Sequence, residues 1–418
     1  MAEESQRTMT GILRLLAQND RVAKFMKILI ATPLFPPEIG GPATYVFNLA
    51  SRLAQRGIEV LVITYGSSFR LLWEKTEAGF EKIEIPLAGN KFQRYWNFFK
   101  QTRENGRNCD VIYVHDLWSV GLSARCVNMF LKKPLIARLG GDSLWEMALE
   151  AGKSEKTLSD FYQNQDNNYL YTRQLLQDSV LKACDKVIFS SNFLKDIFLK
   201  YRPVQESKTG IIENPNRLSF NKPLLGVSGG DSQGNGIKTL LFAGRLTKCK
   251  NLERLFKIFA ALANIDPSLR LKIVGNGPQL ERLMALGIFY NLGAKIQFSG
   301  VLSQTALMAE ISRAYLCLLL SLGEVSPNFA LECLNLRKPL VLTSQNGLPE
   351  SIKSKLVLVS PANEDEMFQA IAGLLDNEKY QAYCEVIANL ELARTWDDIA
   401  DEHIKLFEEV YASKRQKN

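Results

Sequence analysis

The chain has 418 residues, of which 46% are hydrophobic and 23% charged, a balance typical of folded globular proteins rather than disordered ones. This length exceeds one ordinary hydrophobic core and predicts two domains. The net charge of +7 lies mostly within residues 1–220. That excess fits an anionic partner, such as a phosphorylated substrate, an anionic membrane surface or nucleic acid, and it equally fits ordinary charge variation.

Cysteine and histidine usage disfavours disulfide-rich and zinc-binding proteins. The seven cysteines have no paired spacing, and the two histidines stand far apart in the sequence. Unpatterned cysteines of this kind are typical of reduced thiols, so we expect a cytoplasmic protein. No apolar run reaches the roughly 18–20 residues that span a bilayer.

The first half of the chain alternates predicted strands and helices. Residues 1–25 look like an amphipathic extension. The first clear strand, residues 27–32, begins just after Met26. Residues 43–56 have helical spacing closed by Gly57, and Gly40 and Gly41 precede this helix. These glycines allow close backbone approach to a phosphate, although they do not form the GxGxxG fingerprint of dinucleotide-binding proteins. Further strands are expected at residues 60–64, 82–85, 111–114, 135–137 and 186–189.

The second half repeats this pattern after a Gly/Ser-rich stretch at residues 226–236, which we interpret as a linker. Strands are expected at residues 239–243, 271–274, 296–298, 315–320, 339–343 and 356–359. The order predicts two doubly wound α/β domains over residues 26–225 and 237–395, followed by a closing helix over residues 396–418. We expect this helix to cross back and pack on the N-terminal domain. Two such domains leave a cleft between them.

Residues 321–332 are the most informative stretch, because a buried strand there leads through a polar turn into a helix. Such a helix start presents backbone amides to an anion. Glu324 and Glu332 frame the turn, and carboxylates of this kind accept hydrogen bonds from sugar hydroxyls. The spacing of the two acids is weak by itself, and a loop acid plus a solvated helix acid would also explain it.

Four other residues stand at the ends of predicted strands. Arg245 and Lys250 suit a diphosphate, although surface cations at a strand end are equally ordinary. Asp142 follows two glycines, where it is either a site residue or common turn chemistry. His115 is the histidine better placed for chemistry, and a structural hydrogen-bonding role is the alternative.

Aromatic and basic residues alternate between Lys91 and Arg107. This pattern is typical of a helix that lies on an anionic membrane surface. The alternative is that Tyr95, Phe98 and Phe99 pack on the sheet while the cations face water. Stacking on RNA would need further aromatic platforms that the sequence lacks, so no nucleic-acid partner is expected.

Taken together, these motifs resemble those of the family-4 glycosyltransferases, retaining enzymes of the GT-B fold that use nucleotide-activated sugars. The resemblance runs from Met26 to the final helix and is carried by eight motifs in order: Pro36-Pro37-x-x-Gly40-Gly41, Asp110-Val-Ile-Tyr-Val-His115, Ser190-Ser191 with Glu213-Asn214-Pro215, Gly244-Arg245-Leu246-x-x-x-Lys250-Asn251, Gly275-x-Gly277-Pro278, Phe298-x-Gly300, Glu324-x7-Glu332 and Asn346-Gly347-Leu-Pro-Glu350. The resemblance implies transfer of a sugar, with retention, from a nucleotide-diphosphate sugar to a glycan or lipid-linked acceptor. The implied setting is cell-envelope or exopolysaccharide synthesis at the cytoplasmic face of the membrane.

The resemblance also implies roles for individual residues. Arg245 and Lys250 would grip the donor diphosphate, Glu332 the ribose hydroxyls, and Glu324 would lie beside the donor sugar. The other implied donor contacts are the turn residues Ser326, Asn328 and Phe329, Gly40 and Gly41 from across the cleft, and Gly300 and Val301 near the nucleobase. His115 is a possible contact to sugar or acceptor. No DxD-type metal-binding pair is present where the fold would place one, so neither a metal nor a cofactor is expected.

The sequence departs from the family pattern at several places, including Cys333 after the second acid and Arg337-Lys338-Pro339-Leu340 where Gly-x-Pro-Val is usual. Val325-Ser326-Pro327 replaces the usual Gly-Phe-Gly, and Pro327 removes one N–H donor. Asp142 lies near the place of a histidine that often ends its strand, so we treat Asp142 as a catalytic candidate that takes over a polar contact. The competing interpretation of the whole chain is a non-catalytic, sugar-nucleotide-binding partner subunit of such a pathway.

Overall fold

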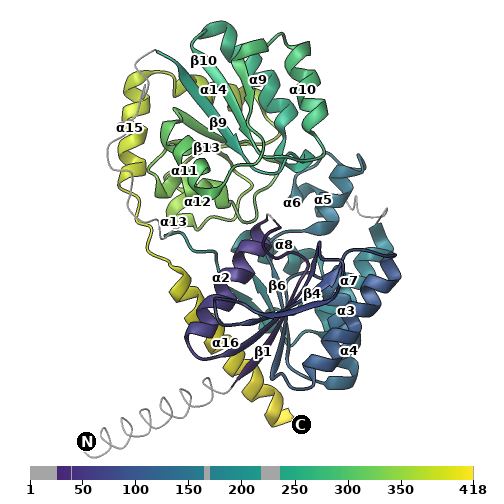
Figure 1. The fold of residues 1–418 in the computed structure, drawn as a ribbon. Helices are drawn as coiled ribbons and strands as arrows, with labels where there is room; N and C mark the ends of the chain where they lie inside the picture. Colours follow the sequence, from purple (N-terminus) through teal and green to yellow (C-terminus); the bar gives the residue numbers. More distant parts are fainter. Residues whose placement is uncertain (1–25, 39, 164–169, 218–235, 418) are drawn as a thin grey trace, which may run out of the picture.

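The computed structural model describes residues 26–38, 40–163, 170–217 and 236–417, which form two α/β domains facing each other (Figure 1). The extension over residues 1–25 lies outside the described residues, as does the linker over residues 226–236 except for Gly236. Within the described parts of the chain, no helix combines the length and the apolar character of a membrane span.

The N-terminal domain is built on an eight-stranded sheet in the order β3-β4-β2-β1-β5-β6-β7-β8. Neighbouring strands are parallel except β3, which runs antiparallel to β4. The strands are β1 (Lys27–Thr32), β2 (Glu59–Gly66), β3 (Leu72–Lys75), β4 (Glu81–Pro86), β5 (Val111–Val114), β6 (Leu135–Leu139), β7 (Lys186–Phe189) and β8 (Thr209–Ile211). The helices are α2 (Gly41–Gln55), α3 (Lys91–Gly106), α4 (Ser119–Leu131), α5 (Ser143–Glu150), α6 (Leu158–Gln163), α7 (Tyr171–Ala183), α8 (Asn192–Tyr201) and the short η2 (Glu206–Lys208).

Both faces of this sheet are buried, which explains why its central strands are continuous apolar runs. In β1, Ile28 and Ile30 pack in the layer that holds α2, whereas Leu29 and Ala31 pack in the layer that holds α4. The helix pattern expected for residues 43–56 corresponds to α2, and Gly57 just beyond it has a φ of 82° that favours glycine.

The C-terminal domain has a six-stranded parallel sheet in the order β11-β10-β9-β12-β13-β14. The strands are β9 (Lys238–Ala243), β10 (Leu269–Val274), β11 (Ile296–Phe298), β12 (Leu316–Leu319), β13 (Leu340–Thr343) and β14 (Val357–Val359). The helices are η3 (Lys248–Lys250), α9 (Leu252–Ile265), α10 (Leu280–Phe289), η4 (Gly293–Lys295), α11 (Gln304–Arg313), α12 (Asn328–Asn335), α13 (Glu350–Lys353), α14 (Glu364–Gly373) and α15 (Asn377–Ala388).

Two strands at the edges of the N-terminal sheet were not among the sequence predictions. Strand β3 is largely exposed, so its side chains lack the continuous apolar run that marks a buried strand. Strand β8 has three residues, all only partly buried. In both strands, partial burial leaves only a weak apolar pattern in the sequence, and the strand forms because it pairs with its neighbour in the sheet.

The last helix, α16 (Trp396–Lys417), returns to the N-terminal domain, as the sequence predicts (Figure 1). It packs against α2, where Arg56 forms ion pairs with Asp397 and Asp401 at 3.0 and 2.9 Å. The returning segment also meets the loop after β8: the Asn216 amide donates to the Arg394 carbonyl at 3.0 Å. Arg394 in turn holds Glu402 of α16 through two hydrogen bonds of 2.6 Å.

Phe407 of α16 tests this packing. Its fully buried ring lies 5.3 Å, centroid to centroid, from that of Tyr113 in β5. We expect Phe407→Ala to lower the free energy of unfolding of the N-terminal domain by about 3–5 kcal/mol, because it leaves a cavity. Urea unfolding followed by circular dichroism measures this, with Phe289→Ala, whose ring is 77% exposed, as control. Equal effects of the two changes would contradict a shared core.

Candidate functional site

The turn between β12 and α12 is held by a buried carboxylate. Glu324 is only 5% exposed and accepts hydrogen bonds from Lys250 Nζ at 2.7 Å and Ser321 Oγ at 2.5 Å. Its backbone is tied to the neighbouring loop, because the Glu324 amide donates to the Gln345 carbonyl and the Gly347 amide donates to the Glu324 carbonyl, both at 2.8 Å. The turn is therefore fixed by both side-chain and main-chain bonds.

Two cations follow β9, as the sequence predicts. Burial lowers the pKa of Lys250, but the Glu324 carboxylate and other groups more than offset this, so the pKa is raised overall. Arg245 is exposed, and its side chain has no hydrogen-bond or ion-pair partner among the described residues. One cation is thus anchored while the other is free to bind an anion.

The starts of two helices meet across the cleft. A Cβ added to Gly41, the first residue of α2, would lie 3.3 Å from Asn328 Nδ2, at the first residue of α12. Neither helix has a side-chain cap, so first-turn amides stay available, apart from Pro42, which has no N–H, and Asn328, whose amide donates to the Ser326 carbonyl at 2.8 Å. Two positive helix ends facing one gap favour a negatively charged group.

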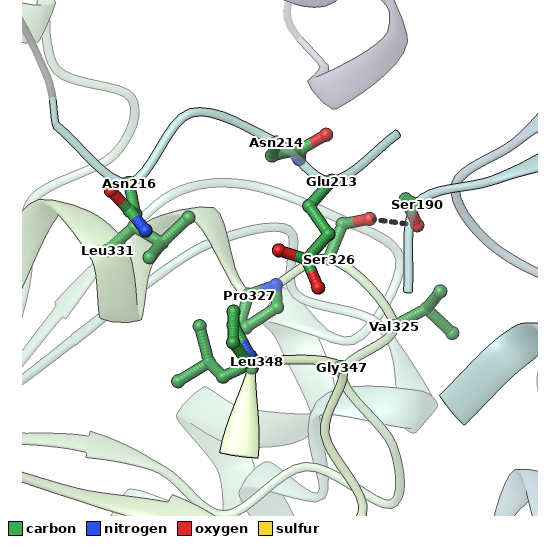
Figure 2. Close-up of a pocket in the computed structure, with 11 residues that line it drawn as sticks. Ser190, Glu213, Asn214, Asn216, Val325, Ser326, Pro327, Leu331, Gly347 and Leu348 are labelled. Atoms are coloured by element: carbon green, nitrogen blue, oxygen red, sulfur yellow. Dashed lines mark hydrogen bonds between the residues drawn. The ribbon is translucent and has the colours of Figure 1, made fainter. Parts of the chain in front are cut away.

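The domains touch around Ser326 and Asn328. Ser326 Oγ lies 3.2 Å from the Gly140 carbonyl and 2.8 Å from Ser190 Oγ, and Asn214 Nδ2 donates to Asn328 Oδ1 at 2.9 Å. A pocket opens at this junction, lined from the N-terminal domain by Ser190, Glu213 and Asn214 and from the C-terminal domain by Ser326, Pro327 and Leu331. Figure 2 shows it, with the Ser326–Ser190 bond marked and the Glu213 side chain pointing toward the α12 turn.

The remaining candidates for binding the donor substrate all lie in the C-terminal domain: Glu332, Gly300, Val301 and Phe329. Burial raises the pKa of Glu332, and Gln304 Nε2 donates to its carboxylate at 3.1 Å, which lowers the pKa by less. Gly300 follows β11 with a left-handed φ of 62°, and the Val301 side chain beside it is 53% exposed. Phe329 is buried in the core, so only its backbone is available to a ligand.

Asp142 has internal partners for both carboxylate oxygens. It begins α5 by accepting the Trp145 amide at 2.9 Å, and its other oxygen accepts the Tyr162 hydroxyl at 2.6 Å. Tyr162 also accepts a hydrogen bond from the buried Arg202 at 2.9 Å, and Arg202 is paired with Asp178 at 2.7 Å. The arrangement favours a positioning role for Asp142 at the start of α5, and its contact with a substrate remains a prediction.

Glu146, one turn into α5, is a candidate that sequence reasoning missed. Surrounding protein raises the pKa of its carboxyl, an effect partly opposed by Arg245 and Lys250 of the other domain. Nearby, the Lys248 amide donates to Glu150 Oε1 at 2.8 Å, which joins the end of α5 to η3. A single acid on a short, largely apolar helix does not stand out in the sequence as a site residue. Only the packing of α5 against the other domain shows that Glu146 lies near the cleft.

His115 lies where β5 ends, buried at 8% exposure between α2 and α16. Burial, together with Arg138 and His403, lowers the pKa of its imidazole well below the usual value, so the ring is neutral. His403 is a structural residue, since its ring nitrogens lie 2.7 Å from the Tyr113 hydroxyl and from the Ile399 carbonyl.

The Lys250–Glu324 pair gives a testable prediction. Lys250→Ala leaves the buried carboxylate without its cation, and we expect it to lower the free energy of unfolding by about 1–3 kcal/mol. Because the pKa of Lys250 is raised above 10.5, this stabilisation is present below pH 10.5 and is lost at higher pH. Thermal denaturation measures it, with Lys257→Ala, in an exposed 2.5 Å pair with Glu364, as control. An equal loss in the two variants would contradict it.

Both halves of the chain match known protein families. The family described as Glycosyltransferase Family 4 matches residues 39–219, and the family described as Glycosyl transferases group 1 matches residues 232–389. An uncharacterized glycosyltransferase, MJ1607 of Methanocaldococcus jannaschii, is 24% identical over 91% of this chain and 98% of its own. The phosphatidylinositol N-acetylglucosaminyltransferase gpi3 subunit of Schizosaccharomyces pombe is 20% identical over 91% and 80%.

The fold has a close parallel among solved structures. Sucrose-phosphate synthase from Thermosynechococcus elongatus superposes with a TM-score of 0.75 at 19% identity, covering 93% of this chain and all of the other. Its two-domain GT-B architecture matches the two parallel sheets seen here. The chain is therefore a glycosyltransferase of the group 1/family 4 type with the GT-B fold.

Proposed function

We propose that the protein transfers a sugar, with retention, from a nucleotide-diphosphate sugar to a glycan or lipid-linked acceptor. The observation that carries the proposal is the charge arrangement of the cleft: Lys250 anchored on Glu324, an unpaired Arg245, and two uncapped helix starts. These groups supply positive charge where a diphosphate would leave.

The chemistry follows from where charge develops. Cleavage of the anomeric bond puts negative charge on the departing nucleoside diphosphate, and preorganised cations and amides lower that barrier. Arg245 and Lys250 are assigned this role, so the proposal needs no metal. Glu324 is assigned to the donor sugar and Glu332 to the ribose hydroxyls, while the acceptor attacks from the same face of the sugar.

The remaining roles follow the same geometry. Gly40 and Gly41 let the N-terminal domain approach the diphosphate, and the α12 amides near Asn328 bind phosphate oxygens. Glu146 is assigned to the acceptor side, since it belongs to the N-terminal domain but its electrostatic partners include Arg245 and Lys250. A carboxylate there would orient the acceptor hydroxyl.

An exposed aromatic surface on α3 and α4 supports the proposal of a lipid-linked acceptor. On α3, Phe98 is fully buried, whereas Phe92 and Trp96 are 75% and 57% exposed. Phe130 of the neighbouring α4 is 68% exposed and lies 5.8 Å from the Arg103 guanidinium. Exposed aromatic rings among cations fit an anionic bilayer, so we propose action at the cytoplasmic face of the membrane during cell-envelope polysaccharide synthesis.

Glu332 tests the donor site. A nucleotide-diphosphate sugar at a hundredfold its dissociation constant should stabilise the wild type by about 2.7 kcal/mol, and Glu332→Ala should remove most of this shift. A thermal-shift screen over uridine, guanosine, adenosine and thymidine diphosphates and their sugars measures it, with Glu350→Ala as control. Loss of the shift in both variants, or in neither, would contradict the assignment. A shift without turnover or donor hydrolysis would favour the partner-subunit interpretation.

The exposed rings test membrane contact. Phe92→Ala with Trp96→Ala should reduce co-flotation with phosphatidylglycerol vesicles by about tenfold or more, because two rings lose apolar burial. Ile288→Ala with Phe289→Ala, which removes two side chains that are 82% and 77% exposed on α10, is the matched control. Unchanged flotation of the α3 variant would rule out this surface.

A further inference from the structure

We propose that Tyr45, His115 and Arg138 form an anion-binding subsite in the N-terminal domain, whose ligand is a phosphate group carried by the acceptor. The inference rests on the proposed function, because it assigns the phosphate to the substrate that receives the sugar. The three residues come from different elements: the first turns of α2, the end of β5 and the end of β6.

Tyr45 lies between the other two side chains, with Arg138 over the face of its ring and the His115 ring tilted against it at 48°. The Arg138 guanidinium carbon lies 3.5 Å from the centroid of the Tyr45 ring, and the Tyr45 and His115 rings are 5.6 Å apart. All three residues are at least nine-tenths buried. Yet Tyr45 Oη, His115 Nε2 and Arg138 Nε have no hydrogen-bond partner. Buried polar atoms are seldom left unpaired, so three in one cluster point to a missing ligand.

The charge of this cluster is also unbalanced. Arg138 Nη2 donates to Asn214 Oδ1 at 2.8 Å and to the Ile212 carbonyl at 3.5 Å, both neutral acceptors. Within the described residues it has no carboxylate partner, whereas the buried Arg202 is paired with Asp178. A buried, unpaired guanidinium is unfavourable by itself and is stabilised by an incoming anion.

The subsite lies beside the cleft. Arg138 Nη1 is 3.3 Å from where a Cβ on Gly140 would stand, and Ser326 Oγ of the other domain is 3.6 Å from the same point. Asn214, which holds the guanidinium, is also the residue that contacts Asn328 across the cleft. Separation of the domains breaks these few side-chain contacts and opens the way to Arg138.

The donors favour phosphate over other anions. The unpartnered atoms are Arg138 Nε, the Tyr45 hydroxyl and Nε2 of the neutral His115 imidazole, three polar groups in one buried cluster. A phosphate offers tetrahedral oxygens to such a set, whereas a carboxylate offers two in one plane. The acceptor phosphate is carried either by a soluble sugar phosphate or by a lipid, two sources that share this chemistry.

Calorimetric titration of inorganic phosphate into the full-length chain tests the subsite. We expect two phosphates per wild-type chain, one in Arg138→Gln, one in Arg245→Gln and none in the double variant. Each single change should weaken its own site by about tenfold or more. Arg282→Gln, at an arginine whose side chain is 60% exposed, controls for the loss of charge and should leave both sites intact.

The outcomes separate this inference from the proposed function. Loss of phosphate only in Arg245→Gln overturns the subsite and leaves the donor site standing, whereas loss only in Arg138→Gln does the reverse. Tyr45→Phe keeps the stacked ring and removes one donor, so weaker phosphate binding there, with an unchanged circular dichroism spectrum, supports the subsite even if Arg138→Gln misfolds. Unchanged binding in Tyr45→Phe argues against it.

Two further probes identify the source of the phosphate. Glucose 6-phosphate binding more tightly than inorganic phosphate, with the gain lost in Arg138→Gln, supports a soluble sugar phosphate. The same pattern with farnesyl phosphate supports a lipid phosphate. If neither probe gains over inorganic phosphate, the acceptor assignment is overturned.

Discussion

A single carboxylate holds the centre of this protein together. Glu324 is buried at the domain junction, where the Lys250 ammonium and the Ser321 hydroxyl compensate its charge. Without them the carboxylate would have to be protonated or exposed, and the turn before α12 would lose its shape. That turn carries Ser326 and Asn328, which contact the other domain. The proposed donor site and the domain contact therefore depend on the same ion pair.

The sequence predicted the fold well because the central strands are buried on both sides. Continuous apolar runs identify such strands, and alternation with helices leaves the doubly wound sheet as the outcome. The prediction missed β3 and β8, because strands exposed at the sheet edge lack the continuous apolar run of a buried strand. The sequence also predicted the returning α16, whose apolar face needs a partner.

The site was only partly readable. Arg245, Lys250, Glu324 and Glu332 belong to local motifs that are weak singly, and the order of those motifs along the chain, through the family resemblance, sufficed to propose them. Asp142 was ambiguous between site and turn, and the structure shows it capping α5 while bonded to Tyr162, a residue twenty positions away. Tertiary packing alone places Glu146 near the other domain's cations. No local motif identifies Arg138 as a site residue, because its partners Tyr45 and Asn214 are distant in the sequence.

The domain junction combines polar and apolar contacts, because Leu322 and Val325 of the C-terminal domain pack in a core cluster of the N-terminal domain. Side-chain hydrogen bonds such as Ser159–Gln345 at 3.0 Å and Asn214–Asn328 at 2.9 Å cross it, and water can replace each of them. Such bonds contribute about 0.5–1.5 kcal/mol each after exchange with water. The polar contacts therefore exchange with water when the domains move, whereas the packing of Leu322 and Val325 resists separation of the domains.

The return of α16 has a consequence for synthesis on the ribosome. Ile399, Phe407 and Val410 complete the core layer that β1, β5 and α2 begin, and the buried bond between Tyr113 and His403 spans 290 positions. At about 5–20 residues per second, roughly 15–60 s pass between the translation of the two partners. The N-terminal domain, although it is translated first, therefore completes this core layer only after α16 has been made.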